Sequence, residues 1–231
     1  MGVKPAIVIY THTDYSDIWT PLFSRIKKYM NSYKVNIFVN QEHELIPTEY
    51  NIITYDSKLI YTERLKSCLE QLKDELILFL HEDMILYDVP LHEEISRLSK
   101  LFDSNDLSSI KLIYVKDDDY PSYVDDKLIY NNSSKFSIQP TITTKSYMLE
   151  LTTKYKLNIW DFEAAIDNSG NDFMYKTGNE ILRGMYHCDS IIFPYIATAI
   201  VKGKWNESEY KNELTDIFTE FNIDKTIRGV V

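Results

Sequence analysis

Residues 76–88 read LILFLHEDMILYD, and this stretch decides how the chain folds. A run of five apolar residues leads directly into His81, Glu82 and Asp83. Such a run predicts a strand buried on both faces, as in the parallel sheets of α/β proteins. Two adjacent carboxylates at the edge of a core repel each other and resist desolvation, so they need a partner. The stretch therefore predicts a central strand whose end carries two acids. The partner of these acids is water, a basic side chain or a metal ion.

Apolar strands and amphipathic helices alternate through the first half of the chain. Short apolar runs predict strands at 6–12, 35–40, 76–80 and 109–115. Apolar residues at helical spacing predict helices at 16–32, 61–73 and 91–102. This alternation predicts an α/β fold with a mostly parallel, Rossmann-like central sheet flanked by helices. Ligands of such folds bind at the carboxyl ends of the strands, where His81 to Asp83 are expected.

The second half of the chain has a less regular pattern. The whole chain of 231 residues has a length that fits one domain. Residues 126–139 predict a hairpin around Asn131 to Ser134, and apolar spacing predicts helices at 144–155, near 172–186 and from Tyr210 to Phe221. We expect this change in the pattern of apolar residues to mark the boundary between a first half at 1–120 and a second half at 121–231.

Composition excludes several classes of protein. Apolar residues make up 44% and charged residues 26%, which is typical of a globular chain. The formal charge of −10 argues against a nucleic-acid surface held by phosphate neutralisation. No window approaches the roughly 18 apolar residues of a membrane span, and the run after Ala6 is too short for a signal peptide, so we expect a cytoplasmic protein. Cys68 and Cys188 are expected to be reduced and buried.

Acidic residues provide the candidates for a metal site. Asp83, supported by Glu82, has the carboxylate chemistry that binds Mn²⁺ or Mg²⁺ together with substrate phosphates. A rival cluster, Asp117 to Asp119, follows the strand predicted at 109–115, but adjacent acids of this kind are more often solvated. His187 and His12 are candidate metal ligands or hydrogen-bonding groups.

Basic residues and a second pair of acids complete the candidates. Arg64, at the start of a predicted helix, can pair with Asp83 or with a phosphate. Lys202 and Lys204 surround a glycine and can neutralise a diphosphate leaving group. The segment NIWDFE, 158–163, alternates aromatic rings with Asp161 and Glu163; it predicts either a desolvated base or, more simply, a helix start.

Together these segments resemble a small GT-A-type glycosyltransferase, similar to virus-encoded or bacterial polysaccharide glycosyltransferases. The matching segments are IVIYTHTDYSD, YTERLKSCLEQLKDELILFLHEDM, FSIQPTITTKSYMLEL, NIWDFE and IVKGKW, from about residue 6 to 205. The resemblance implies a GT-A-like single domain, with a nucleotide-sugar-binding half at 1–120 and an acceptor-binding half at 121–231. The family pattern differs at His81, where its first acid would stand.

The resemblance also implies roles for individual residues. A nucleoside-diphosphate sugar, with UDP favoured, would bind a set of donor residues: Thr11, His12, Thr13, Asp14, Asp56, Arg64, Lys202 and Lys204. Asp83, Glu82 and His187 would hold the metal. Asp161, with Glu163 as rival, would deprotonate a glycan acceptor hydroxyl for an inverting displacement. Trp160 and Tyr147 would contact the acceptor.

Two alternatives remain open. A metal-dependent nucleotidyltransferase or phosphoesterase also places acids at strand ends, although it usually needs a tighter ligand set. Release of pyrophosphate from a nucleoside triphosphate would identify the nucleotidyltransferase. A non-catalytic nucleotide-sugar-binding module would bind its ligand without turnover.

Overall fold

The structure is a computed structural model that describes residues 4–104, 107–114, 127–130, 137–165, 172–176, 182–183 and 187–231. Its strands are β1 (Ala6–Tyr10), β2 (Val35–Val39), β3 (Asn51–Thr54), β4 (Leu76–His81), β5 (Ser109–Lys111), β6 (Leu128–Tyr130), β7 (Thr141–Thr144), β8 (Asp172–Tyr175), β9 (Ile200–Val201) and β10 (Lys204–Trp205). Its helices are the 3-10 helix η1 (Thr13–Ile18) and the α-helices α1 (Trp19–Tyr29), α2 (Tyr61–Gln71), α3 (His92–Ser104), α4 (Lys145–Lys154), α5 (Ile159–Ala165), α6 (Lys211–Phe221) and α7 (Lys225–Arg228).

One sheet of eight strands runs through the molecule in the order β3-β2-β1-β4-β7-β5-β8-β6. Its first four strands are parallel to one another, whereas β7 is antiparallel to both of its neighbours, β4 and β5. The predicted α/β fold with a mostly parallel sheet is therefore confirmed. Because β7 comes from the second half of the chain and lies between two strands of the first, the two halves share one sheet.

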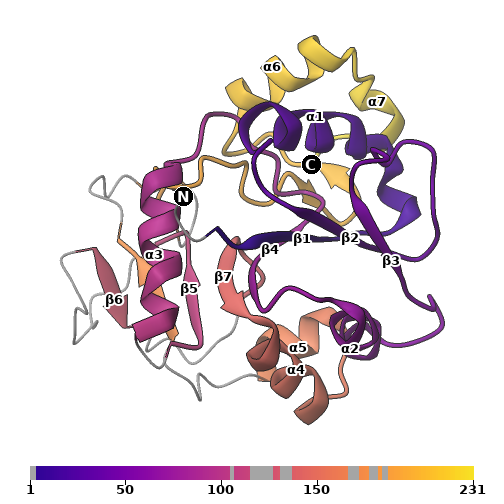
Figure 1. Cartoon of the computed structure of the whole chain (residues 1–231). Helices are drawn as coiled ribbons and strands as arrows, with labels where there is room; N and C mark the ends of the chain where they lie inside the picture. Colours follow the sequence, from indigo (N-terminus) through magenta and orange to yellow (C-terminus); the bar gives the residue numbers. More distant parts are fainter. Residues whose placement is uncertain are drawn as a thin grey trace.

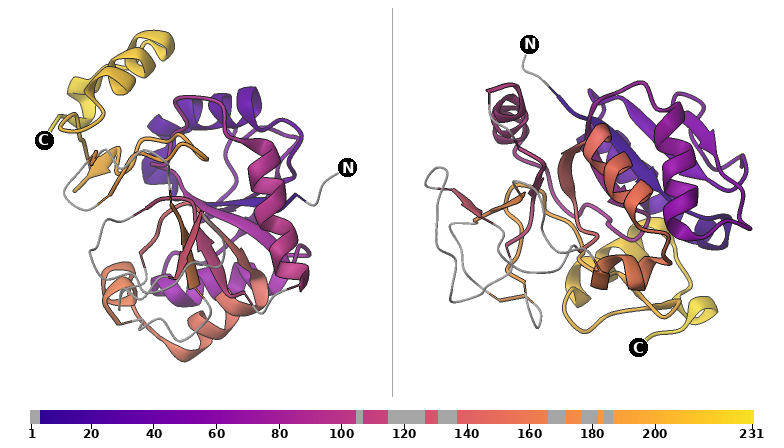
Figure 2. Two further views of the ribbon diagram at one scale, coloured as in Figure 1. Left: turned by 90° about the vertical axis from the view of Figure 1, so that its left-hand side faces the viewer. Right: turned by 90° about the horizontal axis from the view of Figure 1, so that it is seen from below.

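Helices cover both faces of this sheet. Figure 1 shows α2, α4 and α5 beneath the strands and α1, α6 and α7 above them. The view from below in Figure 2 places α2, α4 and α5 in front of the strands. Coverage on two sides explains why β1 and β4 are apolar along their lengths: neither face of these strands meets water.

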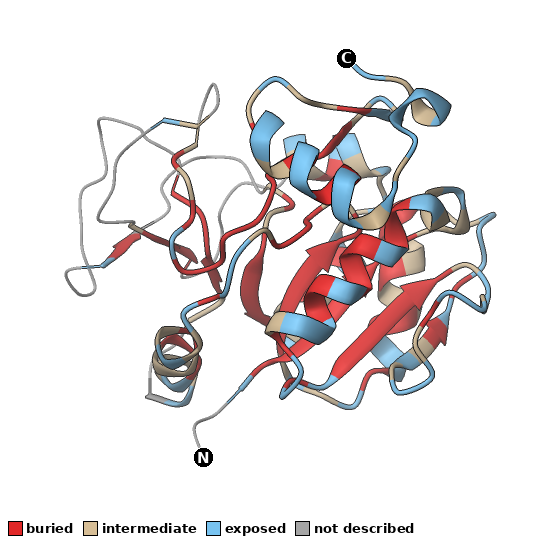
Figure 3. Cartoon of the chain, turned by 90° about the horizontal axis from the view of Figure 1, so that it is seen from above, coloured by how far each residue is buried: buried red, intermediate tan, exposed pale blue. Residues whose placement is uncertain are grey.

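The core is continuous from the strands into the inner faces of the helices. Figure 3 shows buried central strands, while the outer faces of the helices are exposed. Trp19, Leu22 and Ile26 of α1 are almost completely buried, as expected from their spacing along one helix face. Both cysteines are free and buried. Within the described part of the chain, none of the helices combines the length and apolar character needed to cross a membrane.

The predicted helix near 172–186 is wrong at its start, because Asp172–Tyr175 forms strand β8 between β5 and β6. The apolar run there is too short for its period to distinguish a strand from a helix. The turn predicted at Asn131 to Ser134 and the rival acids Asp117 to Asp119 lie outside the described residues.

Candidate functional site

The carboxyl ends of the two central strands meet at a cavity. Tyr10, the last residue of β1, lies opposite His81, the last residue of β4. The turns after these strands, together with the starts of α2 and α5, enclose a volume of about 660 Å³. The cavity is lined by Tyr10, His12, Asp14, Tyr15, Tyr55, Lys58, Leu59, Ile60, Tyr61, Arg64, His81, Glu82, Asn158 and Ile159. The site is therefore at the sheet edge where an α/β fold binds its ligands.

Aromatic rings form one wall of the cavity. The ring of Tyr10 stacks on Tyr55 with centroids 5.2 Å apart and planes 3° apart, and on His81 at 5.2 Å and 30°. Tyr61 meets Tyr10 edge-on at 5.1 Å, and its hydroxyl lies 3.1 Å from His81 Nε2. Burial lowers the pKa of His81 to about 3, so this imidazole is neutral. The ring of His81 thus belongs to an aromatic wall suited to a flat ligand.

The two acids after β4 are in a different situation. Glu82 is only 9% exposed, and its Oε2 has no hydrogen-bond partner among the residues that the structure describes. Burial, together with the neighbouring Asp83 charge, raises the pKa of Glu82 to about 8. Burial raises the pKa of Asp83 to about 6, against a backbone hydrogen bond from Ile200. A buried carboxylate oxygen without a donor is a place where a cation would restore the lost stabilisation.

The donor set fits a hard divalent cation only in part. Glu82 and Asp83 offer the oxygen ligands that Mg²⁺ and Mn²⁺ prefer. However, the described residues contain no group of three or more His, Cys, Asp or Glu side chains that could hold a metal. The predicted trio fails because His187 lies elsewhere: its ring stacks on Tyr210 at 6.4 Å and its Nε2 lies 3.9 Å from Glu209. Substrate oxygens and water would have to supply the other positions.

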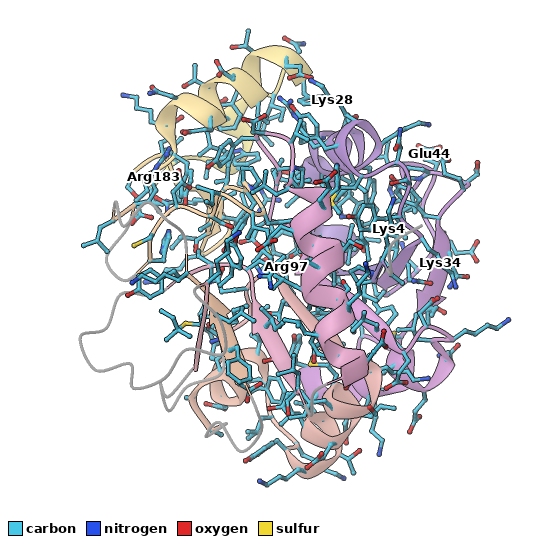
Figure 4. All side chains as sticks on the ribbon, turned by 60° about the vertical axis from the view of Figure 1, so that its left-hand side comes forward. Lys4, Lys28, Lys34, Glu44, Arg97 and Arg183 are labelled. Atoms are coloured by element: carbon cyan, nitrogen blue, oxygen red, sulfur yellow. The ribbon has the colours of Figure 1, made fainter. Side chains whose placement is uncertain are left out.

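Tyr210 belongs to a structural cluster around Arg183. The Arg183 guanidinium lies 4.3 Å from the Tyr210 ring centroid and pairs with Asp189 at 3.0 Å and with Glu213 of α6. Figure 4 shows Arg183 beneath that helix. His187 therefore takes part in a contact that fastens α6 to the body of the protein.

Arg64 lines the cavity but does not pair with Asp83. Its Nε donates to the Leu59 carbonyl at 2.6 Å, another of its nitrogens donates to the Ser57 carbonyl, and its guanidinium lies 5.6 Å from the Tyr55 centroid. Asp56 accepts a hydrogen bond from the Lys58 backbone at 2.9 Å, which fixes the same turn. These residues thus build the turn beside the cavity, and Lys58 reaches its lining.

The loop after β1 divides its predicted residues between packing and the cavity. Thr11 is buried and accepts a hydrogen bond from Trp19 Nε1 at 2.8 Å, and Thr13 is bonded to Asn40. His12 and Asp14 do line the cavity, and His12 Nδ1 accepts the Asp14 N–H at 3.1 Å. The structure therefore brings His12 and Asp14, but not the two threonines, to the cavity lining.

The two candidate bases on α5 differ in position. Asp161 is exposed and accepts the side-chain amide of Asn158 at 2.6 Å, as in a helix-start turn. Glu163 is partly buried, accepts the Ile138 N–H at 2.6 Å, and is near enough to Asp83 for its charge to raise that pKa. Of the pair, the structure directs Glu163 towards the acids after β4.

The proposed acceptor residues lie in contrasting environments. The side chain of Trp160 is 74% exposed, next in sequence to the cavity-lining Asn158 and Ile159. Tyr147 is partly buried, and its hydroxyl donates to Asp172 at 3.0 Å. Tyr147 is thus held within the fold, while Trp160 is free to meet a ligand.

Two basic residues near the acids escaped the sequence analysis. Lys111 is buried at the end of β5, donates to Ser137 at 2.9 Å, and has a pKa lowered by burial to about 8. Arg228, in α7, lowers the pKa of Glu82 through its charge. Arg228 reaches the site across 211 residues of sequence, so no local pattern could indicate it. Lys111 is a lysine within an apolar strand run, and that signal was available.

Lys202 and Lys204 belong to the β9–β10 hairpin. Lys202 and Gly203 form its turn with φ of 49° and 78°, a region that glycine adopts at little cost. Neither lysine lines the described cavity. The preceding strand of the hairpin supplies the Ile200 N–H that bonds Asp83.

No protein-family model matches the sequence, and no curated protein matches it either. Solved structures do match. A cytidylyltransferase from Leptospira borgpetersenii matches with 14% identity over 97% of this chain and 98% of that chain, with a TM-score of 0.52. The bifunctional IspDF from Campylobacter jejuni has 13% identity over 77% of this chain, which spans 50% of that enzyme, with a TM-score of 0.48. A 2-C-methyl-D-erythritol 4-phosphate cytidylyltransferase from Thermus thermophilus has 8% identity over 77% and 89% of the two chains, with a TM-score of 0.45.

The Leptospira match corrects the resemblance expected from the sequence. The chain was expected to resemble a glycosyltransferase that moves sugar from a UDP-sugar to a glycan, but a solved structure that it matches over 97% of its length is a cytidylyltransferase. The expected glycosyltransferase assignment is therefore wrong. The GT-A-like sheet that motivated it is also the sheet of this nucleotidyltransferase, so strand pattern and acid placement do not separate the two classes. At this level of identity the match shows the fold alone, an α/β domain with a mostly parallel central sheet flanked by helices.

Proposed function

We propose that this protein is a nucleotidyltransferase that moves a nucleoside monophosphate group from a nucleoside triphosphate to a phosphorylated small molecule. The observation that carries the proposal is the pair Glu82 and Asp83, one of them with an unpartnered buried oxygen, at the edge of an aromatic cavity. In the reaction an acceptor phosphate oxygen bonds to the α-phosphorus, and the bond from that phosphorus to the pyrophosphate oxygen breaks. The full-length likeness to a cytidylyltransferase supports the proposal.

The aromatic wall is the place for the nucleobase. Tyr10 and Tyr55 present stacked rings, and Tyr61 fixes the neutral His81 beside them. A flat heterocycle gains stacking energy on such a surface without needing a charged partner. Lys58 and Arg64 line the same cavity and contribute positive charge near the bound nucleotide.

The acid pair is the place for a divalent cation bound with the phosphates. Glu82 and Asp83 would hold Mg²⁺ or Mn²⁺, which supplies charge stabilisation of the transferring phosphoryl group and the leaving pyrophosphate. The Ile200 N–H bonds the Asp83 carboxylate and helps to orient it. The requirement for ionised acids ties activity to a pH at which the cation can displace their protons.

No general base is needed for this reaction. A phosphate monoester has a second pKa near 6, so its oxygens are already largely deprotonated at neutral pH. The exposed Asp161 is therefore not required to remove a proton. Glu163 instead accepts the Ile138 backbone N–H, and its charge acts on Asp83 and on buried Lys111.

Pyrophosphate release tests the proposal directly. The protein is incubated with each of CTP, UTP, ATP, GTP and dTTP, with Mg²⁺ or Mn²⁺ and a panel of sugar 1-phosphates and polyol phosphates. We expect pyrophosphate release that requires one nucleotide, one metal and an acceptor. Asp83→Asn should abolish release while the variant still binds the nucleoside. Binding of nucleotides without release for any acceptor in the panel would contradict nucleotidyl transfer.

A second candidate, a nucleotide-binding module without chemistry, is favoured by one specific observation. The turn after β1, which faces the cavity, carries Asp14 and Asp17 but no lysine or arginine, and Arg64 is engaged by backbone carbonyls. Acids at this position repel a triphosphate. Saturable binding of a nucleoside or monophosphate, unaffected by Mg²⁺ and with no turnover, is the result that this candidate predicts.

A further inference from the structure

Arg228 joins three segments at the edge of the cavity. Its Nε donates to Asp17 at 2.9 Å, and a second nitrogen donates to the other oxygen of the same carboxylate. Its third nitrogen donates to the Gly203 carbonyl at 3.0 Å. The guanidinium lies 5.2 Å from the ring centroid of Tyr15, which lines the cavity. One cation thus contacts both the η1 turn and the β9–β10 hairpin.

The position of Arg228 does not depend on Asp17 alone. The Gly203 carbonyl and the Tyr15 ring hold the guanidinium from two further sides. The side chain of Arg228 is 11% exposed, whereas that of Asp17 is 46% exposed. An exposed carboxylate can return to water at little cost, because ion pairs at the surface contribute little net stability. Asp17 is therefore the replaceable member of this pair.

The guanidinium is also placed for the chemistry of the site. Arg228 is close enough to Glu82 for its charge to act on that carboxyl. The hairpin that accepts its third hydrogen bond supplies the Ile200 N–H that bonds Asp83. A two-pronged hydrogen bond from arginine fits a phosphate as well as it fits a carboxylate. A phosphate at the position of the Asp17 carboxylate would therefore meet the same guanidinium whose charge acts on Glu82.

We propose that Arg228 is a phosphate-binding residue of the nucleotide site and that Asp17 occupies its guanidinium until the phosphates of the bound nucleotide displace it. The inference rests on the proposed function, because it assumes that a nucleotide binds in this cavity. It adds a third cation to Lys58 and Arg64 of the cavity lining: the charge of Arg228 acts on Glu82, and its guanidinium is held in reserve on an exposed acid. It also assigns α7 a part in binding, through a residue far from the rest of the site in sequence.

Two substitutions with opposite expected effects test the inference. Calorimetry measures the binding of CTP with Mg²⁺, and of cytidine alone, to the full chain and its variants. If the pyrophosphate assay identifies a different nucleoside triphosphate as the substrate, that triphosphate and its nucleoside replace CTP and cytidine. Arg228→Gln should weaken triphosphate binding about tenfold or more, because it removes a charge-assisted contact. Asp17→Asn should tighten triphosphate binding by about two- to tenfold, because the competitor for the guanidinium loses its charge. Neither should change the affinity for the nucleoside.

A matched control comes from the same segment of the chain. Lys225 of α7 pairs with Glu207, away from the cavity, so Lys225→Gln removes an ion pair of the same helix without touching the proposed contact. It should leave triphosphate affinity unchanged. If Arg228 only fastens α7 to the body, Asp17→Asn and Arg228→Gln will change affinity in the same direction or not at all, and the inference is overturned. If the wild-type protein binds neither triphosphate nor nucleoside, the proposed function fails instead.

Discussion

His81 and Glu82 are neighbours at the end of β4, and their buried polar atoms differ in whether they have a hydrogen-bond partner. His81 is buried among Tyr10, Tyr61 and Phe79, its Nε2 is paired with a hydroxyl, and its pKa is lowered to about 3 so that it carries no charge. Glu82 is equally buried, but its Oε2 has no hydrogen-bond partner in the described part of the chain, and burial raises its pKa to about 8. A paired buried polar group is part of the architecture, whereas an unpaired one leaves binding energy for a ligand.

The contrast has a chemical consequence along the strand. Both residues follow the same apolar run, and both cost free energy to bury. The cost at His81 is offset within the protein by Tyr61 and the stacked rings. The cost at Glu82 is not offset by any described hydrogen-bond partner of Oε2, and Asp83 increases it. We therefore expect changes at the acids to affect function most, and changes around His81 to affect stability most.

The largest effect expected is on catalysis by the acid pair. Asp83→Asn keeps the size of the side chain and removes its charge, so it should lower the rate of pyrophosphate release by about 1,000-fold, equivalent to ~4 kcal/mol of transition-state stabilisation. Asp88→Asn is the matched control, since Asp88 is an exposed acid near the same strand end that accepts only the Val89 N–H in the described contacts. Initial rates with saturating nucleotide check the prediction. Equal losses in both variants would mean that Asp83 has no special role.

The next effect is on stability and depends on pH. The folded pKa of Glu82 is near 8 and its usual value is near 4.5, and Asp83 is raised from 3.8 to about 6. Between about pH 4 and the folded pKa of each group, about 8 for Glu82 and about 6 for Asp83, the unfolded chain releases the proton while the folded chain keeps it, so the metal-free protein loses stability as pH rises. Glu82→Gln should therefore raise the free energy of unfolding at pH 8 by on the order of 2 kcal/mol, and the gain should vanish near pH 4.

Chemical denaturation with and without Mg²⁺ measures this effect. A divalent cation at the acid pair should stabilise the wild-type protein at pH 8 and leave Glu82→Gln much less affected, because a ligand that binds only the folded state raises its stability. A Glu82→Gln gain that is the same at pH 4 and pH 8 would show that burial does not shift this carboxyl in the folded protein.

The sequence indicated the architecture better than the site. Buried strands such as 76–80 and amphipathic helices such as 61–73 depend on local periodicity, which the sequence displays directly. The pairing of Arg228 with Asp17, the occupation of Arg64 by the 57–59 turn and the separation of His187 from the acids arise only from the folded arrangement. Charged residues near an acid motif therefore predict which groups are available, and folding decides which of them meet.

A smaller effect, on stability, is expected at His81, whose buried nitrogen has a hydrogen-bond partner. Tyr61→Phe removes the hydroxyl that pairs with His81 Nε2 at 3.1 Å and leaves a buried nitrogen without its partner. Urea denaturation should show a loss of about 1 to 3 kcal/mol, with pyrophosphate release nearly unchanged at a temperature well below unfolding. Tyr50→Phe is the control, since the buried Tyr50 hydroxyl has no hydrogen-bond partner among the described residues, and its removal should be neutral or stabilising. The contrast between satisfied and unsatisfied groups breaks down if the two variants lose equal stability.

The smallest effect on stability is expected at Trp160, which, unlike His81 and Glu82, is exposed. Its side chain is 74% exposed beside the cavity-lining Ile159, so Trp160→Ala should change the free energy of unfolding by no more than about 0.5 kcal/mol. An exposed ring of this size at the rim of a site is available to stack on a second substrate. If Trp160 contacts the acceptor, the variant should raise the KM for the acceptor several-fold, by about 1 kcal/mol of lost contact, with nucleotide affinity unchanged. Steady-state kinetics with the acceptor varied at saturating nucleotide measure this split. A lower kcat with an unchanged acceptor KM would place Trp160 outside the acceptor site.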